Sequence, residues 1–87
     1  MFAAPGIAGA CDFVTSTNRS LTFRWPSAMS ATFYRLVGDG VDETSDTNII
    51  TVTDLTPGSR YSFTVWAVGS DGLASNNVTC TNSTGLL

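Results

Sequence analysis

The sequence predicts an all-β domain of antiparallel strands, and three observations support this class. Residues 61–67 carry apolar side chains at every odd position, and residues 21–26 show a similar alternation. A period of two is typical of a half-buried strand. Apolar residues make up 43% of the chain and charged residues 13%, and the Val, Ile, Thr and aromatic content favours strands over helices or disorder. At 87 residues, the chain has the length of one domain with one small core.

The first three strands are expected at residues 11–16, 20–25 and 32–37. Residues 17–19 are interpreted as a turn and residues 26–30 as a short loop, because Asn, Pro and Ser favour such connections. Alternation then assigns each strand an inward and an outward face. The inward positions are Cys11 and Phe13 in the first strand, Leu21, Phe23 and Trp25 in the second, and Tyr34 and Leu36 in the third.

A tight hairpin is expected at residues 38–40, because Asp-Gly tolerates the positive φ values of such a turn. It leads either into a short strand at residues 41–44 or into a bare hairpin without a strand. The fifth strand is expected at residues 48–54, where Ile50 and Val52 share one face. These elements continue the antiparallel order of the first three.

The sixth strand is expected at residues 60–68, directly after a Pro-Gly turn. A loop at residues 69–75 leads into the last strand at residues 76–81, with Val78 and Cys80 facing inward. The chain is therefore predicted to contain seven strands and no helix.

The segment Leu55-Thr56-Pro57-Gly58-Ser59-Arg60-Tyr61, together with Trp25, resembles the fibronectin type III domain. That family has a Trp on its second strand and a Leu-x-Pro-Gly-x-x-Tyr segment before its sixth. The resemblance covers about residues 11–84 and implies a seven-stranded, immunoglobulin-like β-sandwich of fibronectin type III topology. It also implies that Tyr61 is a corner residue whose hydroxyl bonds the backbone near residues 56–58. The expected structural core residues are Trp25, Tyr34, Leu55 and Tyr61.

The two ends of the chain are interpreted as lying outside this domain. Residues 1–10 are taken as a linker or as residues added for expression, and residues 85–87 as a linker, which leaves residues 11–84 for the domain. The alternative for Ala8-Gly9-Ala10 is the tail of a signal peptide, but the segment has no positively charged region and is shorter than a signal peptide.

The two cysteines allow a rival fold. Cys11, Trp25 and Cys80 have nearly the spacing of an immunoglobulin variable domain. Only seven residues follow Cys80, too few for a further loop and strand, and Val78 stands where that fold has its corner Tyr. The fibronectin-like assignment instead places the cysteines on neighbouring edge strands of opposing sheets, where we expect a disulfide. The alternative is two buried free thiols acting as small apolar residues.

Composition and spacing exclude several classes of function. The chain has four basic residues and seven acidic ones, with no His, so it offers no basic surface for nucleic acid or an anionic membrane. No run is long enough for direct membrane insertion. The carboxylates lie at predicted turns and strand ends, so we expect no catalytic residue and no cofactor. The acidic residues of the hairpin region lack EF-hand spacing, and a solvated hairpin is preferred over a Ca²⁺ site for Asp39, Asp42, Glu43 and Asp46.

Three Asn-x-Ser/Thr motifs begin at Asn18, Asn77 and Asn82, each at a position expected to be a turn or exposed. In a secreted protein, at least one of them is expected to carry a glycan. The loop at residues 69–75 contains no Arg-Gly-Asp, so the integrin binding of some fibronectin type III domains is not expected here.

The resemblance implies an extracellular location, in a secreted protein or the ectodomain of a membrane protein. The expected role is a non-catalytic module for protein–protein interaction in adhesion or reception, and the alternative is a structural spacer in a tandem array. The alternation of side chains along the strands places several apolar residues and one Arg on the same outward face. This face is a possible interaction surface, because aromatic residues and Arg are enriched at interface hot spots. The alternative is an intramolecular cation–π pair of Arg35 on Trp66. The face consists of Phe33, Arg35, Val37, Trp66 and Val68, with Asn77 expected close to Val68.

Overall fold

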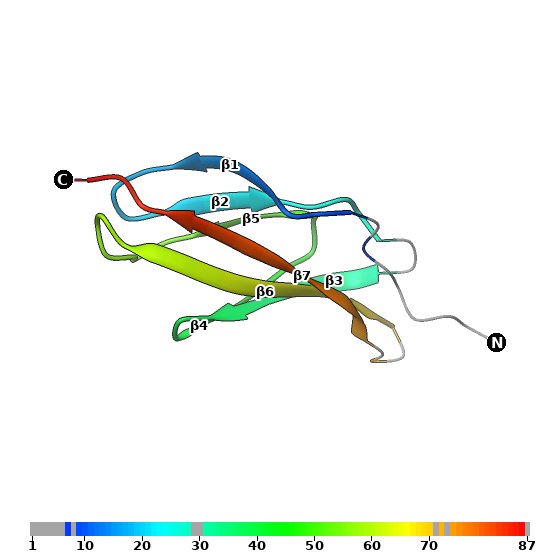
Figure 1. Ribbon diagram of the computed structural model, residues 1–87. Helices are drawn as coiled ribbons and strands as arrows, with labels where there is room; N and C mark the ends of the chain where they lie inside the picture. Colours follow the sequence, from blue (N-terminus) through cyan, green and yellow to red (C-terminus); the bar gives the residue numbers. More distant parts are fainter. Residues whose placement is uncertain (1–6, 8, 29–30, 71, 73, 87) are drawn as a thin grey trace.

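The computed structural model describes residues 7, 9–28, 31–70, 72 and 74–86, and these form two antiparallel sheets packed face to face (Figure 1). The three-stranded sheet has the order β1-β2-β5 and the four-stranded sheet the order β4-β3-β6-β7. The predicted seven-stranded all-β sandwich is confirmed. The strands are β1 (Asp12–Ser16), β2 (Leu21–Arg24), β3 (Ala31–Gly38), β4 (Val41–Ser45), β5 (Ile49–Val52), β6 (Arg60–Gly69) and β7 (Ala74–Ser83).

No helix in the described part of the chain is long and apolar enough to cross a membrane.

Strand β4 is a true strand and not a bare hairpin, because it pairs with β3 over five residues, from Tyr34 opposite Ser45 to Gly38 opposite Val41. The turn between them has positive φ at Asp39 and Gly40, as the Asp-Gly pair predicts. Gly38 has a separate role. A Cβ there would lie 2.4 Å from the carbonyl oxygen of Ser62, so only glycine permits this approach of β3 to β6.

Two strands differ in length from the prediction. Strand β5 ends at Val52, and Asp54 has a φ of 62°, which no extended strand accommodates. Strand β7 spans Ala74–Ser83, longer than the expected residues 76–81, because it pairs with the ten-residue β6 along nearly the whole length of that strand. The backbone of β7 therefore obtains more hydrogen-bond partners than the side-chain pattern alone indicated.

The core lies between the sheets and is formed by the inward positions that alternation predicted. Trp25, Tyr34 and Leu55 are buried, and Tyr61 is half-buried against the same cluster. Phe13 is an exception. It lies opposite the buried Phe23, with the ring centroids 6.2 Å apart, yet it remains 43% exposed. Strand β1 is the edge of its sheet, so no further strand covers this ring.

The folded domain begins before Cys11, contrary to the expected boundary. Ile7 is only 4% exposed and belongs to the core cluster. Beyond it, a Cβ at Gly9 would lie 3.0 Å from the Cγ of Pro26, so the segment before β1 runs close to the loop that follows β2. The assignment of residues 1–10 as a linker is therefore wrong at Ile7, because the apolar residues of this short segment show no periodic pattern.

A hydrogen-bonded lock closes the end of the sandwich where the chain leaves β7. The Oγ1 of Thr84 donates to the carbonyl oxygen of Thr56 at 2.6 Å and accepts from the N–H of Ser59 at 3.0 Å. Gly85 donates its N–H to the carbonyl oxygen of Thr17 and accepts from the N–H of Gly58, both at 2.9 Å. The ordered domain thus includes Gly85, one residue beyond the expected end.

Each tyrosine hydroxyl holds one connecting segment. The Oη of Tyr61 accepts from the N–H of Thr56 at 2.9 Å, in the turn just upstream where the corner role implied a bond. The Oη of Tyr34 accepts from the N–H of Ala28 at 2.7 Å and fixes the loop after β2, a contact that the sequence did not indicate. The first bond is exposed to solvent and the second is buried.

Tyr61→Phe is expected to lower the free energy of unfolding by about 1 kcal/mol, because one hydrogen bond is lost while water can still reach the Thr56 N–H. Tyr34→Phe is the matched control and should cost more, roughly 2 kcal/mol, because it leaves a buried donor unpaired. Urea unfolding of both variants measures the difference. If the urea midpoint of Tyr61→Phe equals that of the unmodified protein, the assignment of Tyr61 as a corner residue is wrong.

Candidate interaction face

The outer side of the four-stranded sheet carries the five residues that parity placed together. In β3 and β6, Phe33 lies opposite Val68, Arg35 opposite Trp66, and Val37 opposite Thr64. Arg35 is exposed, and the other four predicted residues are half-buried. We call these five residues, Phe33, Arg35, Val37, Trp66 and Val68, the Trp66 face.

Arg35 is fixed across this face by two neighbours. Its Cζ lies 5.8 Å from the centroid of the Trp66 ring, the geometry of the cation–π alternative. Its Nε donates to the Oδ1 of Asp42 at 2.9 Å, and its Nη2 donates to Oδ2 at 2.5 Å. This bidentate bond, together with the charge of Arg35, holds the pKa of Asp42 below its ordinary value against an opposing effect of burial. The pair therefore stays ionised at neutral pH and presents no net charge.

An open hollow of about 540 Å³ lies on the same side of the sheet. The apolar part of its lining comes from Phe33, Trp66 and Val68, and the polar part from the Arg35–Asp42 pair and Thr44. Gly72 also lines it. The sequence did not single out Thr44, and it treated Asp42 only as an acidic residue of the hairpin. Their contribution could have been found from the 38–40 hairpin, whose register places β4 beside Arg35 and Val37.

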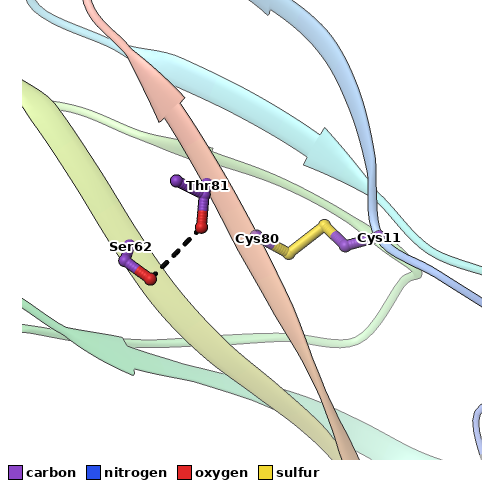
Figure 2. The surroundings of a disulfide bond; sticks show 4 residues. All are labelled: Cys11, Ser62, Cys80 and Thr81. Carbon is purple, nitrogen blue, oxygen red and sulfur yellow. Dashed lines mark hydrogen bonds between the residues drawn. A yellow bond between two sulfur atoms is a disulfide. The ribbon is translucent and has the colours of Figure 1, made fainter.

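The disulfide joins the two sheets at one edge. Cys11, just before β1, is bonded to Cys80 in β7, and their Cα atoms are 5.4 Å apart (Figure 2). Cys80 is buried and Cys11 is partly buried against the core, so the sulfurs lie on the inward side. On the other side of β7, Thr81 and Ser62 of β6 form a hydroxyl pair at 3.2 Å.

The three glycosylation motifs occupy different environments. Asn77 is exposed on β7 and lies opposite Trp66. Val68 follows Trp66 on this face of β6, and a register shift between the two places Val68 itself opposite Ala74. Asn82 lies within β7 opposite Tyr61, and its Oδ1 accepts from the N–H of Ser83 at 2.8 Å. Asn18 is half-buried in the turn between β1 and β2.

Two of the four acidic residues of the hairpin region, Asp39 and Asp42, are engaged in hydrogen bonds. The Oδ2 of Asp39 accepts from the backbone N–H of Ser62 at 3.0 Å, and Asp42 binds Arg35. Within the described residues, no group of three or more potential metal ligands comes together. Asp39 and Asp42 thus act in hydrogen bonds of the sheet and its turn.

Comparison with known proteins agrees with this architecture. The family model of the fibronectin type III domain matches residues 4–81. A crystal structure of FN3tt is 24% identical, has a TM-score of 0.82, and the match covers 97% of this chain and 98% of that one. The fn3 domain of human collagen alpha-1(XX) chain is 17% identical with a TM-score of 0.76, over 98% of this chain and 86% of that one.

A third similar structure belongs to a much larger protein. Chitinase ChiA74 from Bacillus thuringiensis contains a segment 21% identical to this chain with a TM-score of 0.85. The match covers 93% of this chain but only 13% of the enzyme. No curated protein matches the chain. At these identities the structures establish a shared fold, and the proteins that carry it range from an enzyme to a collagen.

Proposed function

The chain belongs to the fibronectin type III family, and we propose that it serves as an extracellular, non-catalytic module that recognises a protein through the Trp66 face. Domains of this family are generally non-catalytic and commonly mediate protein–protein interactions. The disulfide supports an oxidising, extracellular setting, because such bonds persist mainly outside the cytosol. Adhesion or reception is the expected context.

The observation that carries the proposal is the hollow beside Trp66. It joins half-buried aromatic and aliphatic side chains to an ion pair that is already neutralised within the module. A partner that covers this face buries apolar area without having to neutralise an unpaired charge. On the other sheet Phe13, Val14 and Ile49 are exposed, and Ile49 stands opposite the charged Arg24.

A spacer role is the second candidate, and the C-terminal lock favours it. Thr84 and Gly85 are bonded to both neighbouring turns, which gives the chain a fixed direction where it leaves β7. A rigid exit suits a module that sets the distance between its neighbours. In that case the Trp66 face contacts a neighbouring domain or solvent.

Trp66→Ser in the full-length protein tests the recognition role. Once a partner has been captured from the extracellular fraction and identified, its Kd for the variant should rise at least tenfold, the change expected at a hot spot. Ile49→Ser is the matched control, because it removes an apolar residue that is 41% exposed from the opposite sheet. The control should bind like the unmodified protein, and thermal unfolding should show that both variants are folded. Unchanged binding by folded Trp66→Ser would leave the spacer role.

A further inference from the structure

The motif Asn77-Val78-Thr79 lies beside the Trp66 face, and its position is set by strand pairing. Asn77 is directly opposite Trp66, and Thr79 is directly opposite Thr64. Directly paired residues on antiparallel strands have Cβ atoms about 4.5 to 5.5 Å apart and point to the same side of the sheet. Asn77 and Thr79 are both exposed. A group attached to the Asn77 side chain therefore begins next to the indole of Trp66.

The chemistry of this position suits the first sugar of an N-linked glycan. One face of a pyranose ring consists of C–H groups and packs on an aromatic ring, while its hydroxyls need polar neighbours or water. Trp66 offers a half-buried ring. Thr64 and Thr79 adjoin it on the β6 and β7 side, and the Arg35–Asp42 pair adjoins it on the β3 and β4 side. The threonine hydroxyls and the ion pair supply polar neighbours for the hydroxyls of the sugar.

The other two motifs lack this combination. Asn82 is opposite Tyr61, on the side of β7 that also carries the buried Cys80, and its side chain is bonded to the Ser83 N–H. Asn18 is flanked by backbone bonds of Thr17 to Gly85 and of Arg19 to Leu55, in a half-buried turn. Neither residue is paired with an outward-facing aromatic ring in the described strands.

We propose that Asn77 carries an N-linked glycan whose first N-acetylglucosamine packs against Trp66 and thereby controls access to the Trp66 face. The control of access rests on the proposed function, since covering the face matters only if a partner binds there. The packing itself does not rest on it. With the glycan in place, the face is covered and the module acts as a spacer. Without the glycan, the face is open to a partner.

The chain contains two Trp residues, and this makes the packing measurable. Trp25 is 1% exposed, so quenching of fluorescence by acrylamide reports mainly on Trp66. The protein is secreted from eukaryotic cells that make high-mannose glycans. Site occupancy is read by intact mass and by the Asn-to-Asp mass change after peptide-N-glycosidase treatment. Endoglycosidase H then leaves a single N-acetylglucosamine, whereas complete removal by the peptide-N-glycosidase converts the Asn77 side chain to a carboxylate.

We expect Asn77 to be occupied, and the single-sugar form to have a quenching constant at least twofold lower than the sugar-free form. Asn77→Asp is the matched control for complete removal and should quench like the enzymatically deglycosylated protein. Thr79→Ala, which destroys the motif but keeps Asn77, should quench in the same way. An unmodified Asn77, or equal quenching with and without the first sugar, overturns the proposal.

The result of the quenching experiment can be distinguished from the result of the Trp66→Ser binding experiment that tests the proposed function. With partner binding measured on the sugar-free forms, a shielded Trp66 together with normal binding by Trp66→Ser would retain the glycan packing and reject recognition through this face. An unshielded Trp66 with lost binding by Trp66→Ser would reject the packing and retain recognition.

Discussion

Trp25→Ala is expected to lower the free energy of unfolding by about 3 to 5 kcal/mol, the range for deleting a large buried aromatic side chain. Trp25 is among the largest fully buried side chains, and its ring meets that of Tyr34 edge-on with the centroids 5.5 Å apart. Its backbone is also bonded to Asn48, which donates its side-chain Nδ2–H to the carbonyl oxygen of Trp25 at 2.7 Å. The substitution opens a cavity between the sheets, which the surrounding core fills only in part.

Urea unfolding measures this loss, with two variants for comparison. Trp25→Phe should cost less, because a smaller ring remains and because the Nε1 of Trp25 is buried without a hydrogen-bond partner in the part of the chain that the structure describes. Ile49→Ala, in an exposed position, should change the midpoint little. A loss for Trp25→Ala no larger than that for Ile49→Ala would contradict the packing described above.

Reduction of the Cys11–Cys80 bond is expected to lower stability by about 4 kcal/mol on the chain-entropy model, because the two residues are 69 positions apart. The bridge restricts the unfolded chain far more than the folded one. For a domain of this size, such a loss is a large part of the total stability. Reduced protein should therefore unfold at a markedly lower urea concentration.

Unfolding is measured with and without reductant, and the Cys11→Ala/Cys80→Ala double variant separates the bond from any other effect of the reductant. The reductant should leave the double variant unchanged, and that variant should resemble the reduced native protein. Alkylation and intact mass give an independent test. Two alkylatable thiols in the unreduced, natively produced protein would show that the bond is not formed.

Most of the architecture followed from local patterns in the sequence. Alternation in residues 61–67 places Phe63, Val65 and Ala67 inside, and this necessarily puts Trp66 outside. The same parity in β3 brought Phe33 and Arg35 to the same face. Such inferences succeed because the side-chain period of a strand is two, so one buried residue fixes its neighbours.

The parts that were missed depend on how strands meet. The register shift that places Val68 opposite Ala74 requires one extra residue in β7, and no residue type in that stretch marks a bulge. The pairing of Arg35 with Asp42 depends on the register of β3 with β4. Burial of Ile7 depends on tertiary contact of a segment without periodicity. Each of these features is set by contacts between two segments of the chain, and the residue pattern within one segment does not reveal it.

The position of the disulfide determines how the domain responds to a pulling force. Residues 11–80 form one closed covalent loop, so tension applied to the chain on either side of it passes from Cys11 directly into Cys80. Strands β1 to β6 lie inside the loop and cannot be drawn out while the bond is intact. Only the segments outside it can lengthen, and on the C-terminal side this is the end of β7 with its lock at Thr84 and Gly85. When its two ends are pulled, the module is therefore nearly inextensible, and the surface formed by the residues inside the loop keeps its shape.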